Sequence, residues 1–129
     1  MKLDHIGIAV KDLNNSVEVF KKILAGIEPE FEEVEEQKVK VAIFHIGETR
    51  IELLEATSPD SPIQKFIDKK GEGVHHLALG VEGIEGVLAD FSAKGIYLID
   101  TKPRNGAGGK KIAFIHPKSV NGILTEITE

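Results

Sequence analysis

Near its start the chain reads His5-Ile6-Gly7-Ile8-Ala9-Val10, and past its middle it reads His76-Leu77-Ala78-Leu79-Gly80-Val81. In both places a histidine precedes a short run of small and apolar residues, which is typical of a β-strand. A few polar residues and then apolar residues at helical spacing follow. A stretch that carries a glutamate follows each copy about half a domain downstream, at Glu52 and at Glu126. An internal repeat of this length predicts two structural copies that bury faces against each other.

Each copy predicts the same order of elements, strand–helix–strand–strand–strand. The helices are indicated by apolar residues at helical spacing, by an N-cap at Asp12, and by glycine stops at Gly26 and Gly95. We therefore expect an α+β fold of two tandem βαβββ modules in a single domain, 1–129, with module one at about 1–57, a linker helix at about 58–72 and module two at about 73–129. The expected strands are 2–9, 39–46 and 49–55 in module one, with 28–37 as a weak edge strand or loop, and 74–81, 96–99, 112–116 and 123–128 in module two, with a loop over 102–111.

The turn Gly47-Glu48 predicts a two-residue hairpin of type II′. Its register places Glu52 opposite Ile43 and Val41 opposite Leu54, so Glu52 shares a face with apolar residues. An unpaired carboxylate is costly to bury, which indicates a specific role for Glu52. The alternative is that this face is simply exposed to water, as antiparallel sheets allow.

The composition excludes several classes of protein. The chain has 129 residues, a formal net charge of −5 and no cysteine. The net charge argues against nucleic-acid binding, and the lack of cysteine excludes disulfides, thiolate metal sites and cysteine nucleophiles. No apolar run approaches the roughly 20 residues of a membrane span, and no targeting segment is recognisable, so we expect a cytoplasmic protein without membrane contact.

The repeat predicts a metal site made of His5, Glu52, His76 and Glu126. Imidazole nitrogen and carboxylate oxygen suit divalent first-row ions such as Mn²⁺, Fe²⁺, Co²⁺, Ni²⁺ or Zn²⁺. His75 competes with His76, because neighbours on a strand point to opposite faces and only one can join the site. Alignment with His5 favours His76. His75, His45 and His116 are expected to be structural or to support the ligands.

Seven segments of the chain carry a resemblance to a known family: Asp4–Val10, Ile51–Glu55, Asp60–Ile63, Gly71–Ala78, Gly106–Lys110, His116–Ser119 and Gly122–Ile127. Through them the chain resembles the vicinal oxygen chelate superfamily, which includes glyoxalase I, extradiol dioxygenases and bleomycin-resistance proteins. Within it the chain is most similar to the methylmalonyl-CoA epimerase family, over essentially its whole length. The resemblance implies curved mixed sheets around a metal site, the glyoxalase fold.

The resemblance implies metal-dependent epimerisation of (R)- and (S)-methylmalonyl-CoA by proton transfer at C2, in an expected homodimer. It places the metal ligands at His5, Glu52, His76 and Glu126 and favours Co²⁺, with Mn²⁺, Ni²⁺ or Zn²⁺ as alternatives. Glu126 is also the candidate for one catalytic base. A second base of some family members falls at Val41 in this hairpin register, and Val41 cannot move a proton. Either the register differs from the expected one, or Glu48, Lys40 or a metal-bound water takes that role.

The glycine-rich loop and its lysines are candidates for contact with the CoA phosphates, through backbone N–H groups and ammonium charges. The alternative is an ordinary mobile hairpin loop. The residues expected to bind substrate are Gly108, Gly109, Lys110, Lys118 and Ser119.

Two other functions use the same scaffold. A glyoxalase I-type lyase acting on a glutathione hemithioacetal would have nearly the same metal ligands, and only the linker and the His116–Ser119 segment favour the epimerase. A metal-free ligand-binding module would need none of the four ligand residues. An extradiol dioxygenase fits less well, because iron–oxygen chemistry of this kind normally uses two histidines and one carboxylate.

Overall fold

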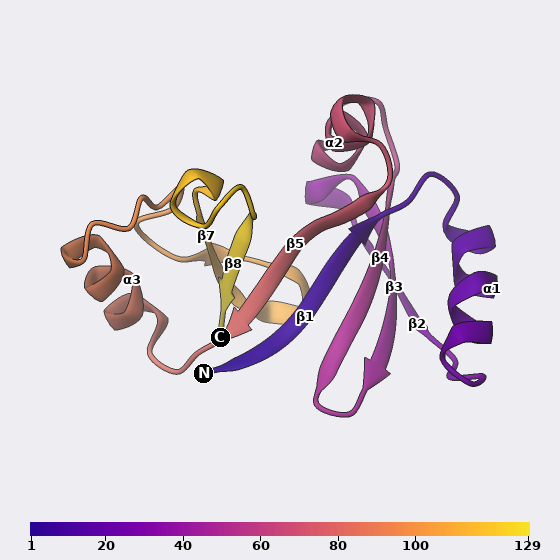
Figure 1. Cartoon of the computed structure of the whole chain (residues 1–129), viewed down its shortest axis with the longest axis horizontal. Coiled ribbons are helices and arrows are strands. Elements are labelled where there is room, and N and C mark those ends of the chain that lie inside the picture. The colour runs from indigo at the N-terminus through magenta and orange to yellow at the C-terminus, as the bar shows by residue number, and fades with distance from the viewer. The chain divides into compact units, whose positions relative to one another are not determined.

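A computed structural model describes all 129 residues, which divide into two compact units (Figure 1). The N-terminal unit is Ile6–His75, and the C-terminal unit combines Met1–His5 with His76–Glu129. Strands β1 (Lys2–Ala9) and β5 (Gly73–Gly80) each contribute residues to both units. The assignment of the chain to a single domain of two modules stays a prediction.

The N-terminal unit is a sheet with one helix on each face. Its strand order is β2-β3-β4-β1, and all pairs from β2 to β4 are antiparallel. Helix α1 begins after Asp12, whose side chain accepts a hydrogen bond from the Asn15 N–H, as the sequence predicts. The further elements are α1 (Leu13–Ile23), β2 (Glu30–Val34), β3 (Val39–Ile46), β4 (Thr49–Ala56) and α2 (Pro62–Lys70).

The β3–β4 hairpin has the predicted register, with Ile43 opposite Glu52 and Val41 opposite Leu54. Gly47 has a φ of 59°, the positive value that the first position of a type II′ turn requires. Because side chains alternate across a strand, the hairpin has two distinct faces. One face packs with α1 through Ala42, Phe44 and Leu53, and the other packs with α2 through Val39, Val41 and Leu54.

The C-terminal unit is a mixed sheet with helix α3 on one face. Its strand order is β1-β5-β8-β7-β6, with β5 and β8 parallel and β8, β7 and β6 antiparallel. Helix α3 packs through Ile84 and Leu88 against Ala113, Ile115 and Ile127 of the sheet. The elements are β5, α3 (Ile84–Ala93), β6 (Arg104–Asn105), β7 (Lys111–Ile115) and β8 (Thr125–Thr128).

The predicted strand at 96–99 is wrong, because only a single bridge forms there, between Leu98 and Ile115. The N–H groups of Ile99 and Asp100 both donate to the Phe114 carbonyl, and the Tyr97 N–H donates to the Ser119 hydroxyl, so the segment satisfies its backbone without a ladder. A short strand, β6, forms instead at Arg104–Asn105, inside the expected loop. The last strand begins at 125 rather than 123 because the Ile123 N–H closes a turn onto the Val120 carbonyl.

The expected α+β class with mixed strand pairing is confirmed. Among the helices, none has both the length and the apolar character that crossing a membrane requires.

We expect Leu53→Ala to lower the free energy of unfolding by about 2–5 kcal/mol, because it leaves a cavity where a fully buried side chain packs against α1. Val19→Ala, on the exposed side of α1, is the control and should change stability by less than about 0.5 kcal/mol. Urea unfolding measures both. Equal effects would contradict the assignment of Leu53 to the core.

Candidate metal centre

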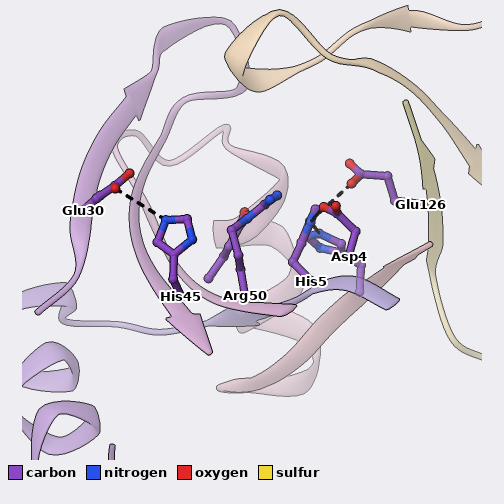
Figure 2. Close-up of polar contacts among 8 residues, drawn as sticks. Asp4, His5, Glu30, His45, Arg50 and Glu126 are labelled. Carbon is purple, nitrogen blue, oxygen red and sulfur yellow. Dashed lines mark hydrogen bonds and ion pairs between the residues drawn. The ribbon is translucent and has the colours of Figure 1, made fainter. Parts of the chain in front are cut away.

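Three buried polar side chains meet in the C-terminal unit: His5 from β1, His76 from β5 and Glu126 from β8. The His5 Nε2 atom lies 3.1 Å from the His76 Nε2 atom and 3.2 Å from a Glu126 carboxylate oxygen. One ligand-type atom from each residue lies within 4.8 Å of the other two. Figure 2 shows the His5 ring directed toward the Glu126 carboxylate.

Sheet topology explains why these three meet. Strands β1, β5 and β8 are consecutive neighbours in the sheet of the C-terminal unit. Ile127 lies on the face covered by α3, so alternation places Glu126 on the opposite face. His76 lies on that face two residues before Ala78, the partner of Glu126 in the parallel pair.

Asp4 completes the cluster on the other side of the His5 ring. Its carboxylate lies 2.8 Å from the His5 Nδ1 atom, and both residues are buried. Because an ionised carboxylate only accepts, the His5 Nδ1–H donates a hydrogen bond to Asp4, and the Nε2 atom of the same ring faces His76 and Glu126. Sequence reasoning missed this role, since alternation alone predicts that neighbours such as Asp4 and His5 point to opposite faces.

The three residues fit a divalent metal ion. Two imidazole nitrogens and one carboxylate oxygen converge, and nitrogen and oxygen donors of this kind suit first-row ions. A histidine ligand whose other ring nitrogen donates to a carboxylate is the usual arrangement in metal sites, because it fixes the tautomer and the ring orientation.

The fourth predicted ligand, Glu52, belongs to the N-terminal unit. Its side chain is 14% exposed, and one carboxylate oxygen lies 3.2 Å from the Arg50 Nε atom. On the same face of the hairpin, the His45 ring lies 3.5 Å from the Glu30 carboxylate (Figure 2). Helix α2 covers the apolar part of this face of the hairpin, and the rest of the face carries the pairs Arg50–Glu52 and His45–Glu30. Because Glu52 is paired, its carboxylate can lie next to Ile43 without a large cost of burial.

The remaining histidines have structural contacts. The His75 ring packs edge-on against Phe66, and burial, with a smaller contribution from Lys70, lowers the pKa of His75 below its usual value. The His116 Nδ1 atom accepts a hydrogen bond from the Lys118 N–H and caps a short turn. His76, and not His75, lies beside His5.

The positions considered for a second base are now placed on the β3–β4 hairpin. Val41 is buried against α2. Lys40 lies opposite Glu55 in the register of the hairpin, and both are on the face opposite to that of Glu52. On that face the Glu55 carboxylate accepts a hydrogen bond from the Leu13 N–H at the start of α1. Glu48 lies in the turn. Of the side chains considered, Lys40 therefore points to the α1 face and away from the face that carries Glu52.

The residues expected to bind substrate fall into two groups in the C-terminal unit. Gly108, Gly109 and Lys110 lie in the turn before β7, where the Gly106 N–H donates to the Lys110 carbonyl. Lys118 and Ser119 lie beyond the other end of β7 and contact Tyr97. Strand β7 has five residues and is about 16 Å long, so the two groups are not one cluster.

Comparison with known proteins agrees with this architecture. Residues 4–114 match the family model of the Glyoxalase/Bleomycin resistance protein/Dioxygenase superfamily. The chain is 35% identical to human mitochondrial methylmalonyl-CoA epimerase and 31% identical to an ethylmalonyl-CoA/methylmalonyl-CoA epimerase of Cereibacter sphaeroides. These alignments cover 99% of this chain in both cases, and 73% and 97% of the two relatives.

A solved structure is similar throughout. The Streptomyces coelicolor methylmalonyl-CoA epimerase in complex with 2-nitronate-propionyl-CoA superposes with a TM-score of 0.90 at 40% identity, over 99% of this chain and 93% of that one. The fold is therefore the glyoxalase fold, as expected. The chain belongs to the methylmalonyl-CoA epimerase family of the Glyoxalase/Bleomycin resistance protein/Dioxygenase superfamily, and it is an enzyme of the epimerase class.

Proposed function

We propose that this enzyme interconverts (R)- and (S)-methylmalonyl-CoA by proton transfer at C2, with the help of a divalent metal ion. The observation that carries the proposal is the convergence of His5, His76 and Glu126 in a chain of this family. The complex of the Streptomyces coelicolor epimerase with a CoA thioester analogue supports a CoA thioester as the substrate class.

His5, His76 and Glu126 would hold the metal, and we propose Glu52 as the fourth ligand. Co²⁺ is the ion we favour, with Mn²⁺, Ni²⁺ or Zn²⁺ as alternatives. When bound, such an ion supplies Lewis-acid stabilisation of the negative charge that develops on the thioester oxygen. Asp4 accepts a hydrogen bond from the His5 Nδ1–H and so favours the tautomer in which Nε2 can bind the metal.

We assign one of the two proton transfers at C2 to Glu126. Its carboxylate is buried and lies among the other proposed ligands, so it can hold a proton beside a bound substrate. Inversion also requires proton delivery to the opposite face of the enolate. Val41 has no titratable group, so the group responsible for that delivery must lie elsewhere.

We propose that the rest of the substrate contacts Gly108, Gly109 and Lys110 in the glycine-rich turn before β7, and Lys118 and Ser119 beyond the other end of that strand. Lys118 lies over the Tyr97 ring at 4.9 Å, and its backbone is fixed by His116. A homodimer and a cytoplasmic location stay predictions.

Deuterium exchange tests the reaction. The wild-type enzyme with Co²⁺ or Mn²⁺ should exchange the C2 proton of methylmalonyl-CoA in deuterated water, and EDTA should stop the exchange, because the enolate charge is then no longer stabilised. Proton NMR follows the C2 signal. A parallel assay for lactoylglutathione formation should show no turnover.

If the metal-loaded enzyme failed to exchange C2 and formed lactoylglutathione, the reaction would be that of a glyoxalase I-type lyase. If it did neither and bound no metal, a ligand-binding module would be the better account.

His76→Ala should reduce bound Co²⁺ from about one ion per chain to a small fraction of that, because it removes one of the converging donors. His116→Ala is the matched control, since that ring caps a turn and faces Tyr97. Equilibrium dialysis with metal analysis gives the stoichiometry. Equal loss of metal in both variants would contradict the assignment of His76.

Asp4→Asn should weaken Co²⁺ affinity by about 10–100-fold, because the neutral amide no longer fixes the His5 tautomer by a charged hydrogen bond. Asp90→Asn, on the exposed side of α3, removes a carboxylate that pairs with Lys94 and should leave the affinity unchanged. Titration of the Co²⁺ absorption spectrum measures both. An unchanged affinity in Asp4→Asn would remove Asp4 from the metal centre.

A further inference from the structure

Strand β2 lies at the end of the sheet of the N-terminal unit and pairs with β3 alone. Alternate residues of an antiparallel strand direct their N–H and C=O groups away from the neighbouring strand, so the outer edge of β2 carries unpaired backbone groups. No backbone hydrogen bond joins Glu30–Val34 to a segment other than β3. The first four residues of the strand are exposed. A further strand can therefore pair with this edge.

An apolar side chain stands in the open beside this edge. Phe31 lies opposite Ala42 in the register, on the face of the sheet that packs with α1, and it is 61% exposed. Ile23 at the end of α1 and Ile27 in the loop that leads into β2 are exposed as well. Exposed apolar residues next to an unpaired strand edge are typical of a surface that binds an extended segment.

The charge of this surface is strongly negative. The stretch from 28 to 36 contains six of the 21 acidic residues of the chain: Glu28, Glu30, Glu32, Glu33, Glu35 and Glu36. Glu28 pairs with Lys21 and Glu30 pairs with His45, at 3.0 Å and 3.5 Å. The other four form no ion pair within 4 Å, although Lys40 lies opposite Glu33 in the register.

This charge restricts which strand can pair with β2. A second copy of β2 would bring glutamates opposite glutamates, and like charges on facing residues are destabilising. A segment rich in Lys or Arg would instead be attracted to the surface and stabilised on it. The occupant that complements this edge is therefore a basic segment of another protein.

The register of β2 specifies the order of residues in such a segment. Glu30, Glu32 and Val34 lie on the face that packs with α2, and Phe31 and Glu33 lie on the face that packs with α1. An antiparallel strand with the sequence Ile-Lys-Lys-Phe-Lys would place these residues, in that order, opposite Val34, Glu33, Glu32, Phe31 and Glu30.

We propose that the outer edge of β2 binds an extended basic segment of a partner protein by strand addition. Basic residues of the partner lie opposite Glu30, Glu32 and Glu33, and an apolar residue lies opposite Phe31. Backbone hydrogen bonds contribute affinity, and the side-chain pairs select the sequence. No residue proposed as a metal ligand lies on β2, so this surface does not depend on the proposed reaction.

A peptide titration tests the proposal on the whole protein. The probe is Ile-Lys-Lys-Phe-Lys with a glycine at each end, and NMR of the isotope-labelled protein gives both the Kd and the amides that shift. We expect saturable binding with the largest shifts in Glu30–Val34. N-methylation of the two adjacent lysines should abolish binding, because one of two neighbouring N–H groups faces β2 and the charge of the peptide is unchanged.

Two variants test the side-chain pairs. Phe31→Ser, and the double variant Glu32→Gln with Glu33→Gln, should each raise the Kd at least about threefold, because they remove facing partners of the peptide. The double variant Glu82→Gln with Glu85→Gln removes two exposed charges of the C-terminal unit and is the matched control, which should leave the Kd unchanged. Co²⁺ binding should be the same in every variant.

Three results would overturn the proposal. These are no saturable binding by the wild-type chain, an equal rise of the Kd in the control variant, or equally tight binding of the N-methylated peptide. A dimer of the wild-type chain that Phe31→Ser separates would assign the edge to a second copy and would also overturn it. Sedimentation equilibrium of both proteins measures this last outcome.

Discussion

The cost of burying polar groups is the constraint on which the C-terminal unit depends. His5, His76 and Glu126 are all buried on one face of the sheet, where an unpaired imidazole or carboxylate would be strongly destabilising. Each contacts another member of the cluster, and Asp4 accepts a hydrogen bond from the His5 Nδ1–H. No buried side-chain nitrogen or oxygen in the chain lacks a hydrogen-bond partner. The polar cluster is therefore compatible with a stable fold and is held in place by it.

The two faces of the C-terminal sheet have different roles, one in stability and the other in the candidate site. The face under α3 is apolar and supplies the core through Ile84, Leu88 and Ile127. The other face carries the cluster and Phe114, whose ring contacts both His76 and Arg104. Stability and chemistry are thus carried by alternate residues of the same short strands. A change of one residue in register would exchange the two sets, so the hydrophobic pattern that fixes the register also fixes the site.

The sequence was sufficient where a local rule determined the outcome. The glycine turn fixed the β3–β4 register, and the repeated histidine pointed to His5 and His76 as neighbours. The sequence was insufficient where long-range contacts determined the local structure. The segment 96–99 has strand-forming residues, but its N–H groups bond to Phe114 and Ser119 outside a ladder. Asp4 was missed because its contact with His5 runs against simple alternation along the strand.

The central claim is that His5, His76 and Glu126 bind one metal ion together. The most direct measurement is the anomalous diffraction of a Co²⁺-loaded crystal, collected at the cobalt absorption edge. The account predicts a single strong peak about 2.0–2.2 Å from the Nε2 atoms of His5 and His76 and from a Glu126 oxygen. A peak elsewhere in the protein, or no peak in crystals saturated with Co²⁺, would contradict it.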